Sequence, residues 1–407
     1  MDKYIVECLT LLLLVPHLSS QESRPVMTLT PAPYRIPSSY FSMNILFHPA
    51  NRVPWPSVPI GGWRTSHVNW AELELAKNQW NFDLLDKYAG WSDQHQLPIL
   101  MSLTYTPPWA SSMPAAPTDV QAGNPSGLSG PPTDMEDWRQ FVRTVATRYK
   151  GRIRTWEIWN EPNRGKSWAG SVDNLVDLTR EAYRILKEVD PSCTVVSPAP
   201  TEKTGLSFLD SFLAHGGGQY ADVIGYHFYV GNDSPEAMVP LIASVKAIMA
   251  KNHVANKPLW DTEAGWISKA PASDELKAAY VARAFILQWA SGVSRYYWYA
   301  WEIQNVPIML VQRDNATLTA GGVAFATVQR WMTGAVMTRC TRFDDGLWVC
   351  ELNNQGVTSH IVWNENQDGE FSIPPEWNAH AVNLLNGAKR PISSRAIPVG
   401  IQPTLVQ

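Results

Sequence analysis

The segment from residue 155 to residue 198 decides the fold, because a strand pattern, a helical pattern and a second strand pattern follow one another within it. Thr155 to Trp159 (TWEIW) is a short run rich in aromatic and β-branched residues. Asp173 to Val189 (DNLVDLTREAYRILKEV) places its leucines, Ala182 and Ile185 on one helical face. Thr194 to Pro198 (TVVSP) is the next strand pattern. Strands joined by a helix pair in parallel, since a parallel pair needs a long crossover connection.

The same alternation extends from about residue 40 to residue 335. Eight strand patterns are present: Phe41 to Phe47, Pro59 to Arg64, Pro98 to Leu103, Thr155 to Trp159, Thr194 to Pro198, Val223 to Tyr229, Pro258 to Thr262 and Arg295 to Trp301. Helical patterns lie between them: Asp83 to His95, Asp134 to Tyr149, Asp173 to Val189, Pro235 to Ala250, Ser273 to Ala290 and Gly321 to Trp331. We therefore predict an α/β fold, a (β/α)8 TIM barrel at residues 38–334. The main alternative, an open doubly wound sheet, usually has a Gly-rich phosphate turn, and no such motif is present.

After Gly334 the pattern changes to short alternating runs separated by Asp-Gly and Asn-Gly turns, which predicts a small antiparallel β-sandwich module at residues 335–407. Strands from residues 21–37 could complete it. Within this module, a hairpin turn at Asp344-Asp345-Gly346 would place Cys340 opposite Cys350, close enough for a disulfide in a secreted protein. Two free thiols are the alternative, and Cys193, in an apolar run, is expected to be a buried free thiol.

The N-terminal residues 1–20 contain the apolar run Leu9 to Val15 after Lys3 and before two serines, which predicts a secretory signal peptide. The run is too short to span a membrane. We therefore expect a secreted or periplasmic protein without a membrane partner after signal removal. Cys8 would leave with the signal.

The composition excludes one class of partner and favours another. The chain of 407 residues has 33 Lys and Arg against 37 Asp and Glu and no long basic run, which argues against nucleic acid as a partner. Its 19 Trp, 14 Tyr and 11 Phe exceed what a core of this size needs. Flat aromatic surfaces suit the faces of sugars.

Two carboxylates close facing strands of the predicted barrel. Glu161 ends the fourth strand and Glu263 the seventh, and the active site of such a barrel lies where strands end. Facing strands of a narrow barrel could bring the two carboxyl groups to about 5 to 5.5 Å, the separation of retaining glycoside hydrolysis. The alternative is a pair of structural carboxylates that cap helices or pair with Arg.

The motifs around these residues resemble a known family. Trp156-Glu-Ile-Trp-Asn-Glu-Pro-Asn163 looks like the Asn-Glu-Pro signature of the largest clan of (β/α)8 retaining glycosidases. Further motifs, and the C-terminal module, look most like glycoside hydrolase family 39 and its neighbours: Gly61-Gly-Trp-Arg64, Trp80-Asn-Phe-Asp83, Thr106-Pro-Pro-Trp109 and Glu136-Asp-Trp138. The resemblance covers about residues 40 to 405.

The resemblance implies a role for each matching residue. Glu161 would be the acid/base, Glu263 the nucleophile, and Asn160 the partner of the sugar 2-hydroxyl. His227 and Tyr229, on one face of the sixth strand, would lie beside Glu263, and Tyr229 or His227 could hold it; the alternative is an ordinary hydrogen bond inside the barrel. Arg64 could lower the pKa of Glu263, whereas the pKa of Glu161 should be raised so that it can donate a proton.

Other residues are weaker candidates at this stage. Trp298 and Trp301 on the eighth strand, and Trp109 with Trp168 and Trp266 on loops, could be sugar-stacking platforms or wall packing. Glu157 and Asp261 lie four and two residues before Glu161 and Glu263, so they should point to the same side of their strands. This spacing predicts that they form a polar layer deeper inside the barrel. The Pro-rich loop from residue 106 to 133 could wall a cleft.

These observations predict a retaining β-glycoside hydrolase that acts on an oligo- or polysaccharide without a cofactor. We expect no metal site, because His48 and His67 lack a third ligand with suitable spacing. The alternative is a catalytically inactive carbohydrate-binding barrel, and a metal-dependent barrel hydrolase would require a ligand cluster. The sugar, the choice between endo and exo action and the oligomeric state stay open.

Overall fold

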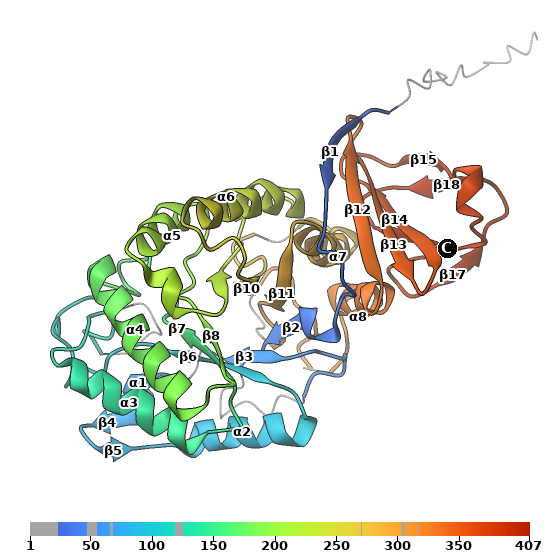
Figure 1. Ribbon diagram of the computed structural model, residues 1–407. Helices are drawn as coiled ribbons and strands as arrows, with labels where there is room; N and C mark the ends of the chain where they lie inside the picture. The colour runs from blue at the N-terminus through green and yellow to red at the C-terminus, as the bar shows by residue number, and fades with distance from the viewer. Residues whose placement is uncertain are drawn as a thin grey trace, which may run out of the picture.

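The computed structural model describes residues 23–46, 55–65, 68–118, 125–269, 271–302, 306–314 and 316–407. It consists of a barrel of parallel strands surrounded by helices and a C-terminal antiparallel β-module beside it (Figure 1). The predicted fold class is confirmed. The signal-peptide segment, Cys8, His48 and His67 lie outside the described residues.

The barrel has eight parallel strands in the order β8-β7-β6-β3-β2-β11-β10-β9. Their bounds are β2 Phe41–Asn44, β3 Trp63–Thr65, β6 Ile99–Leu103, β7 Thr155–Ile158, β8 Thr194–Val196, β9 Ile224–Tyr226, β10 Leu259–Ala264 and β11 Val293–Trp298. Bridges between Val196 and Val223 and between Thr201 and His227 join β8 to β9. The barrel is therefore nearly closed, and each strand lies within or close to one of the eight predicted runs.

Helices follow the strands on the outside of the barrel (Figure 1). They are α1 Trp70–Leu73, α2 Asp83–His95, α3 Met135–Arg148, α4 Val172–Val189, α5 Gly205–Ala214, α6 Met238–Lys251, α7 Asp274–Ala290 and α8 Ala320–Met332. A small hairpin, β4 Glu74–Ala76 and β5 Gln79–Trp80, follows α1. Side chains of Asp134, Ser171, Ser273 and Thr319 accept backbone N–H groups at the starts of α3, α4, α7 and α8.

The sequence analysis missed α5. This helix has ten residues, no side-chain cap, no acidic residue in its first turn and no basic residue in its last. The usual signals of a helix start and stop are thus missing. The helix is instead held by its apolar side, since Leu209, Phe212 and Leu213 are buried.

Strand alternation separates the barrel interior from the helix layer. Asn44 of β2 points inward to Arg64, whereas Phe41 of the same strand packs against Phe285 of α7 at a ring distance of 5.1 Å.

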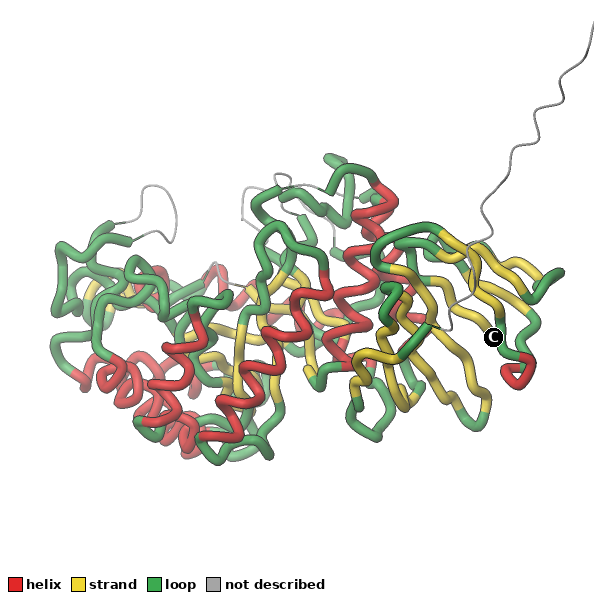
Figure 2. The backbone as a smooth tube through the Cα atoms, turned by 90° about the horizontal axis from the view of Figure 1, so that it is seen from above, coloured by secondary structure: helices red, strands yellow, loops and turns green. Residues whose placement is uncertain are grey.

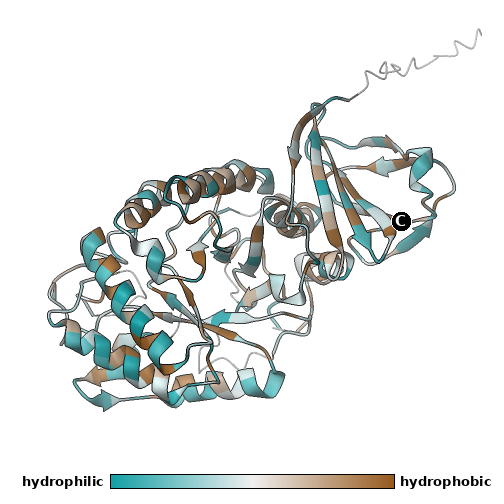
Figure 3. Cartoon of the chain, viewed as in Figure 1, coloured by the Kyte–Doolittle hydropathy of each residue, from teal (hydrophilic) through white to brown (hydrophobic). Residues whose placement is uncertain are grey.

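Hydrophilic residues predominate on the visible side of α4, and α6 carries more hydrophobic ones (Figure 3). No described helix is long and apolar enough to cross a membrane.

The β-module contains a seven-stranded antiparallel sheet in the order β1-β12-β13-β14-β19-β16-β17 and a two-stranded sheet of β15 and β18. The bounds are β12 Val336–Phe343, β13 Leu347–Asn354, β14 Val357–Asn364, β15 Gly369–Ser372, β16 Ala381–Asn383, β17 Lys389–Pro391, β18 Ala396–Val399 and β19 Thr404–Val406. The first strand, β1 Pro25–Leu29, comes from the N-terminal segment and pairs with β12. Figure 2 shows the module beside the barrel.

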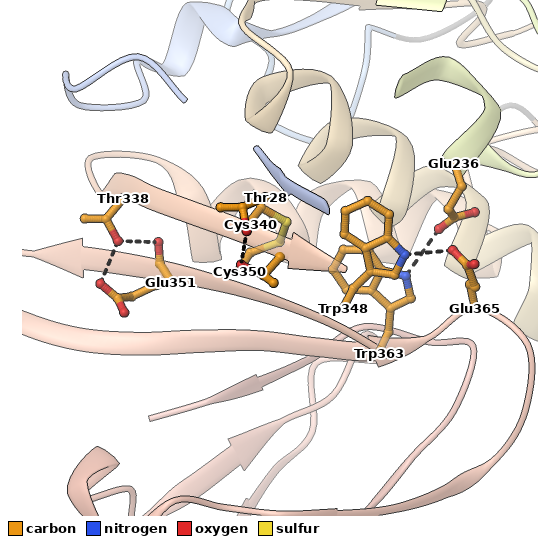
Figure 4. The surroundings of a disulfide bond; sticks show 10 residues. Thr28, Glu236, Thr338, Cys340, Trp348, Cys350, Glu351, Trp363 and Glu365 are labelled. Carbon is orange, nitrogen blue, oxygen red and sulfur yellow. Dashed lines mark hydrogen bonds between the residues drawn. A yellow bond between two sulfur atoms is a disulfide. The ribbon is translucent and has the colours of Figure 1, made fainter. Parts of the chain in front are cut away.

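A disulfide joins Cys340 and Cys350, which are register partners on β12 and β13 (Figure 4). Cys193 is buried and free. Both arrangements are those expected from the sequence.

The module contacts the barrel through two stacked indoles. Trp348 and Trp363 lie with their ring centroids 5.4 Å apart and nearly parallel (Figure 4). Trp363 donates its Nε1–H to Glu236, at 3.3 Å, and Glu236 also pairs with the buried Arg283 of α7. Because Glu236 lies in the short 3-10 helix Pro235–Ala237 before α6, the module is connected to the segment that follows the carboxyl end of β9.

Candidate active site

A β-bulge in β10 directs Glu263 into the barrel mouth. Asp261 pairs with Tyr296 and Ala264 pairs with Trp298, so two residues of β10 lie opposite one residue of β11. A bulge of this kind changes the direction of a side chain. Asp261 Oδ1 accepts the backbone N–H of Glu263 at 3.2 Å and holds the bulge.

The end of β7 brings Glu161 to the same place. Trp159 and Glu161 both have left-handed backbone angles, with φ of 66° and 46°, which few side chains adopt. The backbone N–H of Glu161 donates to Ala199 at 3.0 Å and ties this turn to the end of β8. An oxygen of Glu161, an oxygen of Glu263 and a ring nitrogen of His227 all lie within 4.8 Å of one another.

Arg64 of β3 lies beneath the two carboxylates and is completely buried. It donates to Glu263 at 2.6 Å, to Glu157 at 2.7 and 2.9 Å, and to Asn160 at 2.7 Å. Burial acts against its charge, but the charges of Glu157 and Glu263 raise the pKa of Arg64. The sequence analysis expected Arg64 to act on Glu263, and the guanidinium does contact Glu263 and also Asn160. Because it is buried, Arg64 positions these two side chains and is not itself a substrate contact.

The two polar rings that follow β9, those of His227 and Tyr229, contact different carboxylates. The Tyr229 hydroxyl donates to Glu263 at 3.0 Å. His227 contacts Glu161 through Nδ1 at 3.1 Å and Thr262 through Nε2 at 3.1 Å. Tyr229 is thus beside Glu263, as expected, whereas His227 contacts the other carboxylate.

Glu161 is 9% exposed and lies between the Arg164 guanidinium and the His227 imidazole. Arg164 reaches it at 3.1 Å and His227 at 3.1 Å. Burial raises its pKa, but the hydrogen bond and charge of His227, followed by the charge of Arg164, bring the pKa of Glu161 below its ordinary value. The pKa of His227 is raised, against its burial, by Glu263 and Glu161. The expected rise in the pKa of Glu161 is therefore wrong for the site without substrate.

Glu157 and Asp261 do not form one polar layer. Glu157 lies inside the barrel, where burial raises its pKa but the charge of Arg64 leads to a net lowering. Asp261 faces outward and accepts from Gln288 of α7 at 2.6 Å. Burial raises the pKa of Asp261 to about 7. The prediction that Asp261 points to the same side of its strand as Glu263 was wrong, because the bulge turns Glu263 away from the face that Asp261 occupies.

The structure also speaks against Trp298 and Trp301, on the eighth strand, as sugar-stacking platforms. Trp298 is fully buried and packs against Phe285 in the helix layer, and Trp301 is 1% exposed. The ring at the site is Tyr299, which is half-buried and lies 6.5 Å from the Tyr229 ring. Burial, and then the charge of Glu263, raise the pKa of Tyr299. The sequence contained a signal for Tyr299, because alternate residues of a strand face the same side and Tyr297 and Tyr299 share the inward face.

The loop tryptophans are anchored. Trp109 is half-buried and donates to the backbone oxygen of Glu74 at 3.0 Å. Trp168 packs against Trp159 at 4.6 Å, and Trp266 donates to the backbone oxygen of Asp233 at 2.9 Å. These contacts favour wall packing for Trp168 and Trp266, which are both buried.

The loop after β6 is fastened along its described part. Ser111 pairs with Pro132 and donates to the backbone oxygen of Gly127 at 2.7 Å. Ser129 accepts the backbone N–H of Ala169 at 2.8 Å and so joins the loop after β7. Residues 119–124 of this loop lie outside the described residues.

Glu161, His227 and Glu263 form a group with the ligand types of a metal site. Each is already used differently, because both nitrogens of His227 have hydrogen-bond partners and Glu263 is paired with Arg64. In this group of described residues, both imidazole nitrogens of His227 are therefore already hydrogen-bonded.

Comparisons with known proteins agree with this geometry. Residues 131–325 match the family model described as "Glycosyl hydrolase catalytic core". No curated protein sequence matches the chain.

Solved structures of glycoside hydrolases share the fold. A family 39 glycoside hydrolase from Bacteroides cellulosilyticus WH2 is 18% identical, with a TM-score of 0.71 over 91% of this chain and 82% of that chain. A family 39 β-xylosidase from Caulobacter crescentus is 14% identical, with a TM-score of 0.66 over 94% of this chain and 97% of that chain. A glucosidase from Croceicoccus marinus is 18% identical, with a TM-score of 0.61 over 92% and 82%.

The chain therefore has a (β/α)8 barrel fold, and residues 131–325 within it match a glycosyl hydrolase catalytic core. The resemblance inferred from the sequence motifs is confirmed at this level. The chain has the overall fold of family 39 enzymes, including the antiparallel module after the barrel.

Proposed function

We propose that this protein is a retaining β-glycoside hydrolase with Glu263 as nucleophile and Glu161 as acid/base. The observation that carries the proposal is the approach of the two carboxyl groups to within 4.8 Å. Retaining enzymes have carboxyl groups about 5 to 5.5 Å apart, whereas inverting enzymes need roughly 6.5 to 9.5 Å to admit a water between them.

The surroundings of Glu263 suit a nucleophile. Its Oε2 accepts from Arg64 and its Oε1 accepts from Tyr229, so the carboxylate is held in one orientation. In the first step a Glu263 oxygen bonds to the anomeric carbon, the glycosidic bond breaks, and the leaving oxygen takes a proton from Glu161. In the second step Glu161 removes a proton from water, whose oxygen displaces Glu263 from the sugar.

His227 supplies a reason why Glu161 can act as an acid although its pKa is lowered. The two groups lie at hydrogen-bond distance, and Glu263 raises the pKa of His227. As the Glu263 oxygen bonds to the anomeric carbon, Glu263 loses its negative charge and the pKa of His227 falls. A proton held by His227 then passes to Glu161, which protonates the leaving oxygen in the same step.

Asn160 is placed to bind the sugar. Its Oδ1 accepts from Arg64 at 2.7 Å, so the amide offers its NH2 group as a donor to a sugar hydroxyl. The Tyr299 ring offers an aromatic surface near Glu263. The substrate class inferred from the sequence is an oligo- or polysaccharide, and we propose secretion through residues 1–20, in agreement with the disulfide between Cys340 and Cys350.

The test is hydrolysis of a panel of aryl β-glycosides and β-linked polysaccharides by the wild type, Glu161→Ala and Glu263→Ala. We expect both variants to lose activity. Azide should yield a β-glycosyl azide with Glu161→Ala and an α-glycosyl azide with Glu263→Ala. A wild type that binds glycans but hydrolyses none would support the inactive carbohydrate-binding alternative. Activity that survives both substitutions would show that the site lies elsewhere.

A further inference from the structure

A cavity of about 480 Å³ lies between the beginnings of α5 and α6, at the end of the barrel where the βα loops meet. Much of its wall is aliphatic: Leu206, Val230, Ala237, Pro240 and Leu241. The polar lining comes from Glu202, Lys203, Thr204, Asp233 and Ser244. Tyr229 supplies the one aromatic ring among its lining residues. Such a wall lacks the flat aromatic platforms that suit sugar faces.

The cavity is connected to both carboxylates. Tyr229 lines it and donates to Glu263 at 3.0 Å. Glu202 lines it and accepts from Arg164 at 3.0 Å, and Arg164 reaches Glu161 at 3.1 Å. The hydroxyl of Tyr226 donates to the backbone oxygen of Glu202 at 2.6 Å and supports this rim. The lining of the cavity is thus one contact from Glu263, through Tyr229, and two contacts from Glu161, through Glu202 and Arg164.

We propose that this cavity binds the leaving group of the substrate, and that the leaving group is an apolar alkyl or aryl aglycone instead of a second sugar. The inference rests on the proposed function, because an acid/base must lie on the same side as the leaving oxygen. It replaces the sugar leaving group of the oligo- or polysaccharide inferred from the sequence by an apolar group, and the experiment below separates these two alternatives. Burial of an apolar chain against Leu206 and Leu241 stabilises the bound state in proportion to the area removed from water.

The experiment uses alkyl β-glycosides from methyl to hexyl, made with the sugar that the aryl panel identifies, and the corresponding β-linked disaccharide. For the wild type, kcat/KM should rise by up to about fourfold for each methylene that the cavity buries. The butyl glycoside should be hydrolysed faster than the disaccharide. A flat response to chain length, or a preference for the disaccharide, would overturn the proposal.

Two matched variants on α6 test the location. Ser244 lines the cavity, whereas the exposed Ala243 is its neighbour on the same helix and does not line it. Ser244→Phe should remove the dependence of kcat/KM on chain length, whereas Ala243→Phe should keep the chain-length dependence of the wild type. The same dependence on chain length in Ser244→Phe and Ala243→Phe would contradict the assignment of this cavity to the leaving group.

Binding measurements separate this proposal from the proposed function. If no glycoside is hydrolysed, the proposed activity fails, and dissociation constants for the same alkyl series still test the cavity. A dissociation constant that falls with chain length in the wild type, but not in Ser244→Phe, would keep the cavity as the binding place of an apolar chain. Chain-length independence would reject it.

Discussion

Arg164 contacts both Glu161, the proposed acid/base, and Glu202 at the cavity rim, so two single substitutions should shift the pH profile of kcat/KM in opposite directions. Arg164 reaches Glu161 at 3.1 Å and Glu202 at 3.0 Å. The groups that face Glu161 also include His227, and Glu263 lies within 4.8 Å. Arg164→Gln removes a cation that lowers the pKa of Glu161, so the alkaline limb of kcat/KM should move up by about one pH unit. Glu202→Gln leaves Arg164 to Glu161 alone and should move that limb down.

Both profiles should be measured with one aryl glycoside, against Lys203→Gln as a control in which an exposed charge beside Glu202 is removed. The control should shift the limb little, because exposed charges are screened by solvent. Shifts of the same sign for Arg164→Gln and Glu202→Gln would refute the shared role.

Asp261 contributes a pH dependence to stability that belongs to this single residue. Burial raises its pKa from 3.8 to about 7. Between these values the folded protein holds a proton that the unfolded chain has released, so the contribution of Asp261 falls as pH rises. Asp261→Asn should therefore become more stable relative to the wild type by about 2 to 3 kcal/mol between pH 5 and pH 8. Urea unfolding at the two pH values measures this, and a difference that does not depend on pH would contradict it.

At the scale of elements, the hairpin of β12 and β13 is closed by the disulfide between Cys340 and Cys350, ten residues apart. Closing a loop of this length reduces the entropy of the unfolded chain, and the double substitution to Ser should cost about 3 kcal/mol. Chemical denaturation with and without reductant provides the measurement. Cys193→Ser is the matched control, since Cys193 is buried and free. A reductant effect that persists in the double variant would show that another thiol is responsible.

Across the whole molecule, Glu236 connects the module, α7 and the segment that follows the carboxyl end of β9. Arg283 is 1% exposed and pairs with Glu236, which also accepts from Trp363 (Figure 4). Glu236→Gln leaves the buried guanidinium without a charged partner, and we expect a loss of about 3 to 5 kcal/mol. Trp363→Phe keeps an aromatic ring but loses the N–H donor, and should cost about 0.5 to 1.5 kcal/mol.

Scanning calorimetry would show whether the two parts unfold together. We expect the wild type, in which the Glu236 contacts are intact, to show one thermal unfolding transition. For Glu236→Gln we expect the unfolding transition of the barrel to shift to a lower temperature. Equal losses for Glu236→Gln and Trp363→Phe would mean that the ion pair with Arg283 contributes little.

The sequence by itself determined the order of the strands and the carboxylates that end them. Periodicities of two and 3.6 residues are local, so β7, α4 and β8 could be recognised from their own residues. The ends of parallel strands meet at one face of a barrel, which is why Glu161 and Glu263 could be placed together before any coordinates. The pairing of Cys340 with Cys350 followed from the turn between them.

Only the tertiary structure decided which side chains face the site. The bulge at Thr262 and Glu263 comes from pairing with β11, and it reverses the parity that assigned Asp261 to the interior. Trp298 packs outward against α7, so Tyr299 takes the place at the site. The lowered pKa of Glu161 depends on His227, from another strand, and on Arg164. These features depend on groups that meet only after the barrel closes, and no local pattern contains them.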